Sequence, residues 1–288
     1  MSPAATSVSI LVVQGPEATA LRAAALAEMS GAAACEPAGD ARDPRAWRLR
    51  GATRREGVAA WCDAHHLDHA WVPEGRRFDS LKLLAMDMDS TLITIECIDE
   101  IGGFIDKKDE IAAITSQAMR GEIDYPASLR KRVALLAGLD EDVLQDVYDE
   151  KLRLSPGAEQ LVAHCKRHGV KLLLVSGGFT FFTDRLKERL GLDETISNVL
   201  EIDNGKLSGR VLGTIVDADA KAAKFKHMAQ RLGATREQTV AIGDGANDLK
   251  MMAAAGTSIA YRAKPVVRAK ATYALNHAGL DGVLNLFD

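Results

Sequence analysis

Long hydrophobic runs are missing from this 288-residue sequence. No apolar stretch approaches the roughly 20 residues that a membrane-spanning helix needs, so we expect no membrane partner. The N-terminus lacks the basic start and the small-residue cleavage site of a signal peptide. The four cysteines are widely spaced and form no CxxC pair, which is typical of free thiols in a reducing compartment. Together these absences predict a cytoplasmic protein.

An excess of positive charge is also missing, because the formal net charge is -4 at pH 7. A protein that binds nucleic acid regardless of sequence is normally basic, so we expect no nucleic-acid partner. What the chain does have is 47% hydrophobic and 26% charged residues, the composition of a globular protein. Its length allows one large domain or two ordinary ones.

Residues 1–76 read as a small α+β module that precedes the main domain. The apolar patterns predict strands over 7–13, 46–51 and 69–73, with helices over 17–30 and 53–66. The stretch 31–44 is rich in Gly, Ala and Pro and is predicted to be a loop. This outline resembles a regulatory ACT-like domain, which would imply amino-acid sensing or a homodimer. A stabilising appendage is the alternative.

The remaining residues, 77–288, show short apolar runs separated by helical stretches. This alternation predicts an α/β fold with a Rossmann-like parallel sheet and helices on both faces. One segment, 107–153, reads as consecutive helices without a strand, so we expect an inserted helical cap over about residues 100–153. Asn204-Gly205 lies between two strand-like runs and indicates a hairpin.

Chemically capable side chains follow three of the predicted strands. The first run ends in Asp87 and Asp89, the second in "SGG" at 176–178, and the third in "GDGAND" at 243–248. Ligands of parallel sheets bind beyond the carboxyl ends of the strands, so the three loops should meet. Clustered carboxylates favour a hard divalent cation such as Mg²⁺, and glycine amides with Lys221 suit a phosphate.

A metal site needs only one aspartate at the tip of the first strand. The second, two residues later, indicates a pair with divided roles. One carboxylate would attack phosphorus as a nucleophile, and the other would protonate the leaving alcohol and later accept a proton from water.

These motifs, "DMDST", "SGG", Lys221 and "GDGAND" in this order, resemble the four signature motifs of the haloacid dehalogenase superfamily. The resemblance covers about residues 80–288. Within the superfamily, "DMDSTLITIECIDEI", "AMRGEIDYPASLRKRVALL", "LVSGGFT" and "AIGDGANDLKM" are similar to the phosphoserine phosphatases. The implied activity is Mg²⁺-dependent hydrolysis of O-phosphoserine through an aspartyl-phosphate, the last step of serine biosynthesis.

The resemblance also implies roles for individual residues. Asp87 would be the nucleophile and Asp89 the general acid and base. The Asp87 and Asp244 carboxylates, with the Asp89 carbonyl, would hold Mg²⁺. The phosphoryl group and its surroundings would be held by Ser176, Gly177, Lys221 and Asn247, supported by Gly178 and Asp248. Glu96 and Arg132 would recognise the ammonium and the carboxylate of the substrate.

Three alternatives remain open at this point. The chain could act on another small phosphate ester. It could be a signalling receiver whose aspartate is phosphorylated as a switch, although receivers are shorter and lack the helical insertion and the second aspartate. It could also be a dehalogenase of the same fold, although carbon–halogen cleavage requires neither Asp89 nor Mg²⁺.

Two further features stand apart from this interpretation. The family often has Phe where this chain has Tyr125, so the additional hydroxyl needs a hydrogen-bond partner. In the module, Cys62, His65, His66 and His69 lie close together in sequence, and zinc is conceivable there. A helix end with exposed histidines is the favoured interpretation.

Overall fold

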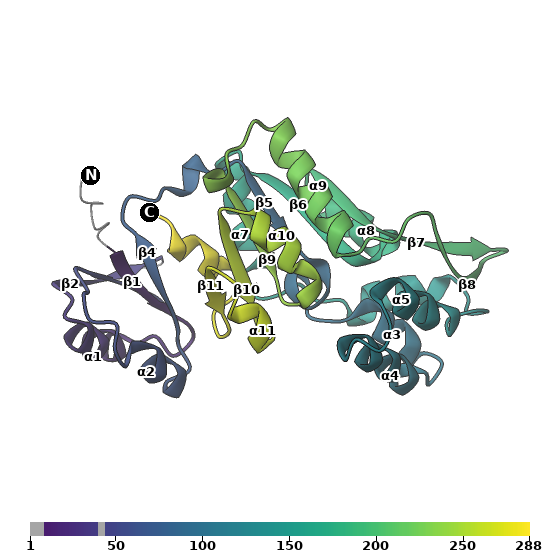
Figure 1. Cartoon of the computed structure of the whole chain (residues 1–288), viewed down its shortest axis with the longest axis horizontal. Coiled ribbons are helices and arrows are strands. Elements are labelled where there is room, and N and C mark those ends of the chain that lie inside the picture. Colours follow the sequence, from purple (N-terminus) through teal and green to yellow (C-terminus); the bar gives the residue numbers. More distant parts are fainter. Residues whose placement is uncertain (1–8, 40–43) are drawn as a thin grey trace.

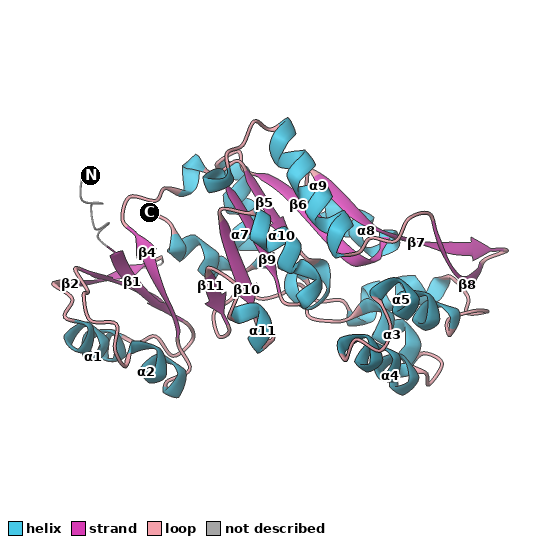
Figure 2. Cartoon of the chain, in the orientation of Figure 1, coloured by secondary structure: helices cyan, strands magenta, loops and turns pink. Residues whose placement is uncertain are grey.

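The computed structural model describes residues 9–39 and 44–288. They form a four-stranded sheet near the N-terminus and a seven-stranded sheet in the rest of the chain (Figures 1 and 2). The larger sheet is mostly parallel and has helices on both faces. The predicted fold class, a Rossmann-like α/β core preceded by a small α+β module, is therefore confirmed.

The smaller sheet has the strand order β2-β3-β1-β4, and every neighbouring pair is antiparallel. Its elements are β1 (Ser9–Gln14), α1 (Ala20–Ser30), β2 (Ala34–Ala38), β3 (Ala46–Arg50), α2 (Val58–Ala64) and β4 (Asp68–Pro73). Side chains of β1 alternate between the two faces. Leu11 and Val13 pack in one apolar cluster with residues of both helices, whereas Ile10 and Val12 belong to the main core of the protein.

Two predictions for this module were wrong. The segment 31–44 is not all loop, because Ala34–Ala38 forms β2. This strand lies at the edge of the sheet and forms because it pairs with β3, an interaction that local composition does not reveal. Pro37 is tolerated there because an edge strand leaves some of its N–H groups unpaired. The second helix begins only at Val58, after Gly57 in the left-handed region at φ 77. Residues 7, 8 and 40–43 lie outside the described part of the chain.

The larger sheet has the order β11-β10-β9-β5-β6-β7-β8. Its strands are β5 (Leu83–Met86), β6 (Lys171–Phe179), β7 (Glu194–Asp203), β8 (Lys206–Leu212), β9 (Thr239–Gly243), β10 (Thr257–Tyr261) and β11 (Tyr273–Leu275). Only β7 and β8 pair antiparallel, through the predicted hairpin at Asn204-Gly205, where φ is 50 and 76. The three-residue β11 was not predicted.

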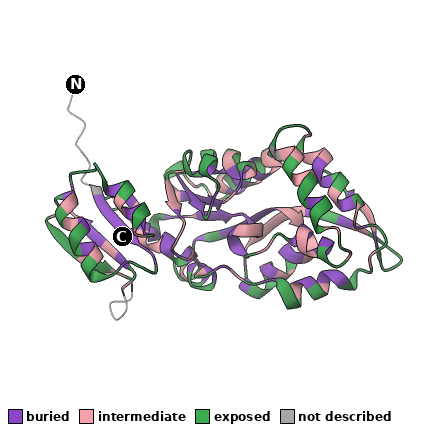
Figure 3. Ribbon diagram, turned by 90° about the horizontal axis from the view of Figure 1, so that it is seen from below, coloured by how far each residue is buried: buried purple, intermediate pink, exposed green. Residues whose placement is uncertain are grey.

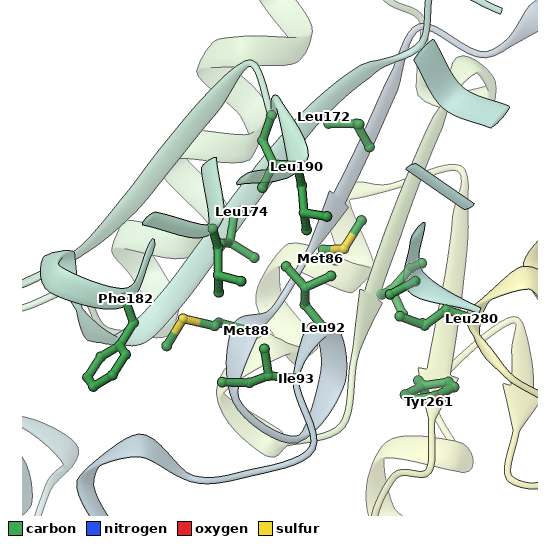
Figure 4. Close-up of a cluster of buried hydrophobic side chains, with 14 of the residues drawn as sticks. Met86, Met88, Leu92, Ile93, Leu172, Leu174, Phe182, Leu190, Tyr261 and Leu280 are labelled. Carbon is green, nitrogen blue, oxygen red and sulfur yellow. The ribbon is translucent and has the colours of Figure 1, made fainter. Parts of the chain in front are cut away.

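Successive residues of the central strands pack on opposite faces of this sheet. Leu84 and Met86 belong to one apolar cluster, and Leu83 and Ala85 to another. The first cluster includes residues of α7 (Ala158–Arg167), α8 (Thr180–Leu190) and η6 (Leu280–Leu286), and the second includes residues of α9 (Ala218–Arg231) and α10 (Leu249–Ala254). The strands are buried on both faces, and the first cluster continues to the tip of β5 (Figures 3 and 4). This packing fixes the loop that follows β5.

Helices without an intervening strand follow β5, as the sequence predicted. They are α3 (Cys97–Gly103), α4 (Lys108–Met119), α5 (Tyr125–Ala134), α6 (Asp142–Asp146) and the short η3 (Val147–Lys151). We call this helical insertion the cap; in Figure 1 its helices lie at the opposite end of the molecule from the module. Among the described residues, no helix combines the length and the apolar character that a membrane crossing would need.

The module is joined to the C-terminal segment by buried polar contacts. Asp68 is buried, and its carboxylate accepts hydrogen bonds from the backbone N–H groups of Asn276, His277 and Ala278 at 2.7, 3.0 and 2.8 Å. Arg48 of β3 forms an ion pair with Asp288. Since Ile10 and Val12 also lie in the main core, the module is packed firmly against the larger sheet.

Candidate active site

Asp87 follows β5 directly, at the centre of the larger sheet. Strand β5 lies between β9 and β6, so the loop after it is flanked by the loops that carry the other two motifs. Asp87 is buried, and its carboxylate accepts a hydrogen bond from Met88 N at 2.8 Å. The loop turns sharply at Ser90, which has a φ of 56. The expected meeting of the three strand ends is therefore observed.

Lys221 reaches this point from the first turn of α9. Its side chain is 1% exposed, and Nζ lies 2.9 Å from Asp87 Oδ1 and 2.8 Å from Asp248 Oδ1. Asp217 caps the helix by accepting hydrogen bonds from Asp219 N and Ala220 N, which fixes where the helix begins. Burial alone would lower the pKa of Lys221, but the two carboxylates raise it above its ordinary value. The lysine is therefore a fixed positive charge.

Two carboxylates contact the lysine, and the carboxylate of Asp244 lies close to both of them. Ligand oxygens of Asp87, Asp244 and Asp248 all lie within 4.8 Å of one another, the only such group of three among the described residues. Burial, and then the neighbouring Asp248 carboxylate, raise the pKa of Asp87 well above its ordinary value, and the same two causes raise the pKa of Asp244 to about 6. When ionised, the three carboxylates and one ammonium carry two excess negative charges, so a divalent cation fits this donor set.

Asp89 is not one of these three carboxylates, and its side chain contacts the cap and β6. Its Oδ1 accepts a hydrogen bond from Cys97 N at 2.9 Å, and its Oδ2 accepts one from Ser176 Oγ at 3.4 Å. Burial raises the pKa of Asp89 above its ordinary value, against the effect of the Cys97 backbone hydrogen bond. The two aspartates of the strand tip thus have different surroundings, which agrees with divided roles.

The "SGG" residues 176–178, which we call the glycine segment, lie within the C-terminal end of β6 and beside the Asp89 carboxylate. Ser176 is buried, and its hydroxyl accepts a hydrogen bond from Gly178 N at 2.8 Å. The carbonyl of Gly177 accepts a hydrogen bond from Asn198 Nδ2 at 2.8 Å. A Cβ at position 178 would lie 2.7 Å from Asp89 Oδ2, so glycine leaves the space that this close approach requires.

The two residues expected to recognise the substrate lie at different places in the cap, one before α3 and one within α5. Glu96 precedes α3 and accepts a hydrogen bond from Ser90 Oγ at 2.7 Å. Partial desolvation, followed by repulsion from Asp89, raises the pKa of Glu96 to about 7. Arg132 lies on α5, and its Nε atom is buried without a hydrogen-bond partner among the described residues. An unsatisfied buried guanidinium donor suits an anionic group of a ligand.

The structure gives contacts to two residues that had no predicted role of their own, Thr91 of the "DMDST" motif and Asn198 of β7. Thr91 donates a hydrogen bond from its hydroxyl to Asp244 Oδ1 at 3.4 Å, and the buried Asn198 orients the Gly177 carbonyl. A polar residue within a strand gives no local signal of such a role. Asn247 lies half-buried on the Asp244 loop, and no hydrogen bond ties its side chain to the other predicted residues of the described chain.

In the part of the chain that the structure describes, Cys62, His65, His66 and His69 do not come together as a group of possible metal ligands. Cys62 is buried in the apolar cluster of the module, and burial raises the pKa of its thiol to about 12. His65 stacks on Trp61 with ring centroids 3.9 Å apart, and His66 contacts the ring of His277. These side chains have separate partners, so the zinc alternative is not supported.

Comparison with known proteins is consistent with this geometry. The family model of the haloacid dehalogenase-like hydrolases matches residues 84–253. The phosphoserine phosphatase of a Polaromonas species is 53% identical over 215 residues, which cover 73% of this chain and 91% of that relative.

Two solved structures are similar to this chain. A probable phosphoserine phosphatase from Vibrio cholerae, in its unliganded form, is 40% identical and covers 97% of this chain and 86% of its own, with a TM-score of 0.82. A substrate-bound phosphoserine phosphatase complex is 36% identical and covers 72% of this chain and 99% of its own, with a TM-score of 0.68.

Proposed function

Because the chain belongs to the haloacid dehalogenase-like hydrolases and, within them, to the phosphoserine phosphatase family, we propose that it hydrolyses O-phosphoserine to serine and phosphate. The observation that carries this proposal is the contact of Lys221 with both Asp87 and Asp248 beside Asp244, under a cap that bears Arg132. Serine as the product would make this the last step of serine biosynthesis.

The cation would be Mg²⁺. The Asp87 and Asp244 carboxylates and the Asp89 carbonyl would hold it, since oxygen ligands and few carboxylates are what this ion favours. When bound, it would neutralise negative charge between the carboxylates and the phosphoryl oxygens.

The covalent step would use the two aspartates of the strand tip. A carboxylate oxygen of Asp87 attacks phosphorus, the bond to the seryl oxygen breaks, and Asp89 transfers its proton to that oxygen. Asp89 then accepts a proton from water as the water oxygen attacks the aspartyl-phosphate, which releases phosphate and restores Asp87. The position of Asp89 apart from the metal-binding carboxylates supports this division.

The phosphoryl oxygens would be bound by Ser176, the Gly177 and Gly178 segment, Lys221 and Asn247. Lys221 is held in place by Asp248, so its charge needs no rearrangement before reaction. At the other end of the substrate, Glu96 would meet the ammonium group and Arg132 the carboxylate. The unpaired Nε of Arg132 supports the second assignment.

A screen of phosphomonoesters with and without Mg²⁺ tests the function. We expect phosphoserine to give the highest kcat/KM, no turnover after chelation, and a loss of several orders of magnitude in Asp87→Asn. Preference for another ester would replace the substrate assignment. Stoichiometric phosphorylation without turnover would instead indicate a receiver, and halide release without Mg²⁺ a dehalogenase.

A further inference from the structure

The hydroxyl of Tyr125 joins the cap to the glycine segment of the core. Tyr125 is the first residue of α5, and its Oη donates a hydrogen bond to the Gly177 carbonyl at 3.1 Å. Burial raises the pKa of Tyr125 to about 12, so the hydroxyl keeps its proton and remains the donor. The Tyr125 hydroxyl therefore has the hydrogen-bond partner that the sequence analysis expected it to need.

The absence of a side chain at Gly177 leaves the space that this hydroxyl occupies. Its φ lies outside the left-handed region, so backbone conformation does not explain the glycine. A Cβ at this position would overlap the Tyr125 hydroxyl oxygen and lie 3.2 Å from Cζ. Space for the tyrosine is thus one reason for glycine here.

The carbonyl that Tyr125 contacts belongs to a continuous hydrogen-bonded network. Asn198 Nδ2 binds the same oxygen from β7 at 2.8 Å, and Asn198 Oδ1 accepts a hydrogen bond from Val216 N. On the other side of the same peptide group, Gly178 N donates to Ser176 Oγ, which in turn contacts Asp89. Asn198 orients this peptide group from within the core, whereas Tyr125 links the same peptide group to the cap through a hydrogen bond.

The helix that carries Tyr125 also carries Arg132. Arg132 follows Tyr125 by seven positions, which is two helical turns, so both lie on the same face of α5, about 10 Å apart along its axis. A bond that fixes the first turn of α5 to the glycine segment therefore also fixes how far the guanidinium lies from the phosphate-binding groups.

We propose that Tyr125 is a positioning residue that sets the spacing between the phosphate-binding segment and Arg132, and thereby the selectivity for a phosphate ester bearing a carboxylate. The inference rests on the proposed function. The tyrosine ring would fill the same space as a phenylalanine ring, and its hydroxyl would additionally fix the distance between the glycine segment and α5.

The test compares Tyr125→Phe with Tyr148→Phe, which removes a hydroxyl from another partly buried tyrosine of the cap. We expect Tyr125→Phe to lower kcat/KM for phosphoserine about fivefold, the effect of one neutral hydrogen bond, mainly by raising KM. For para-nitrophenyl phosphate, which has no carboxylate, kcat/KM should stay within about twofold. Tyr148→Phe should change neither.

Equal effects of Tyr125→Phe on the two substrates, or no effect on either, would overturn the inference. Arg132→Ala, run in parallel, separates this failure from failure of the proposed function. If Arg132→Ala changes the substrate ratio and Tyr125→Phe does not, only the positioning role is lost. If neither variant changes the ratio of kcat/KM for the two substrates, residues of α5 do not recognise the substrate carboxylate.

A stability cycle tests the contact without any substrate. Gly177→Ala should lower the denaturation midpoint more in the Tyr125 background than in the Tyr125→Phe background, because the phenylalanine has no hydroxyl to overlap the new Cβ. Additive effects would show that the two residues do not constrain each other. Backbone amide exchange in α5 should also be faster in Tyr125→Phe than in Tyr148→Phe.

Discussion

Nζ of Lys221 lies 2.9 Å from Oδ1 of Asp87, and both side chains are almost completely buried. The proposed nucleophile is thus in contact with the lysine ammonium group that would bind the phosphoryl oxygens. Lys221 Nζ also contacts Asp248 Oδ1, and this second ion pair fixes the position of the lysine. Because one ammonium is shared by two carboxylates, its removal would leave both without the positive charge that they contact.

Lys221→Met should therefore impair stability as well as activity. Breaking a buried ion pair from one side costs about 3–5 kcal/mol of unfolding free energy, and Mg²⁺ should restore part of it by neutralising the carboxylates. Denaturant unfolding with and without Mg²⁺ measures both effects. Lys224→Met on the same helix is the control, because its pair with Glu194 is partly exposed and should contribute less than about 1 kcal/mol. Similar losses in the two variants would contradict the role of Lys221.

Arg132→Ala should discriminate between substrates. Loss of a charge-assisted contact is worth roughly 1.5–3 kcal/mol, so kcat/KM for phosphoserine should fall on the order of tenfold to hundredfold. Para-nitrophenyl phosphate should be much less affected because it offers no carboxylate. Arg130→Ala, two residues away on an exposed part of α5, controls for loss of charge on the helix. An unchanged substrate ratio would remove the main support for phosphoserine over other small phosphate esters.

Asp68→Ala should destabilise the junction between the module and the C-terminal segment. Three backbone N–H groups lose their acceptor, and at least about 3 kcal/mol of unfolding free energy should be lost. Asp63→Ala, an exposed acidic residue on α2, should change stability by less than about 0.5 kcal/mol. Equal unfolding midpoints for the two variants would show that the Asp68 contacts contribute little.

The Glu194 ion pairs should make a small part of the stability depend on pH. The hydrogen bond from Lys224, together with Arg231, lowers the pKa of Glu194, although partial burial opposes the shift. A folded-state pKa below the unfolded value contributes stability above the unfolded pKa, which is lost as the pH falls through the folded pKa. Glu194→Gln should thus be less stable than wild type at pH 7, and the difference should shrink in acid. A difference that grows in acid would have the wrong sign.

The strands of the core could be predicted because buried parallel strands are short apolar runs with polar ends. The same reasoning placed Asp87, Ser176 and Asp244 at neighbouring strand tips. It failed for β2, whose Ala- and Pro-containing sequence is a strand only because β3 pairs with it. Pairing between segments is a property of the fold and leaves little trace in local composition.

Contacts across long sequence separations were also beyond prediction. The need of Tyr125 for a partner followed from its hydroxyl, but the partner, Gly177, lies 52 residues away on another element. Asn198 gave no signal because its role depends on a carbonyl of the adjacent strand. Residue chemistry thus indicated which groups are needed, and packing decided which of them meet.

The contacts of Asp68 determine when, during synthesis of the chain, the module can dock onto the rest of the protein. The acceptor oxygens of Asp68 bind a backbone segment up to 210 residues downstream, so at ordinary synthesis rates the module waits roughly 10–40 s for its docking partner. During that time the sheet face with Ile10, Val12 and Val72 has no cover from the main core. Chains truncated at residue 270 should bind a dye specific for exposed apolar surface, while the full chain should not. We therefore expect the nascent chain to be most prone to aggregation before its C-terminal segment has been made.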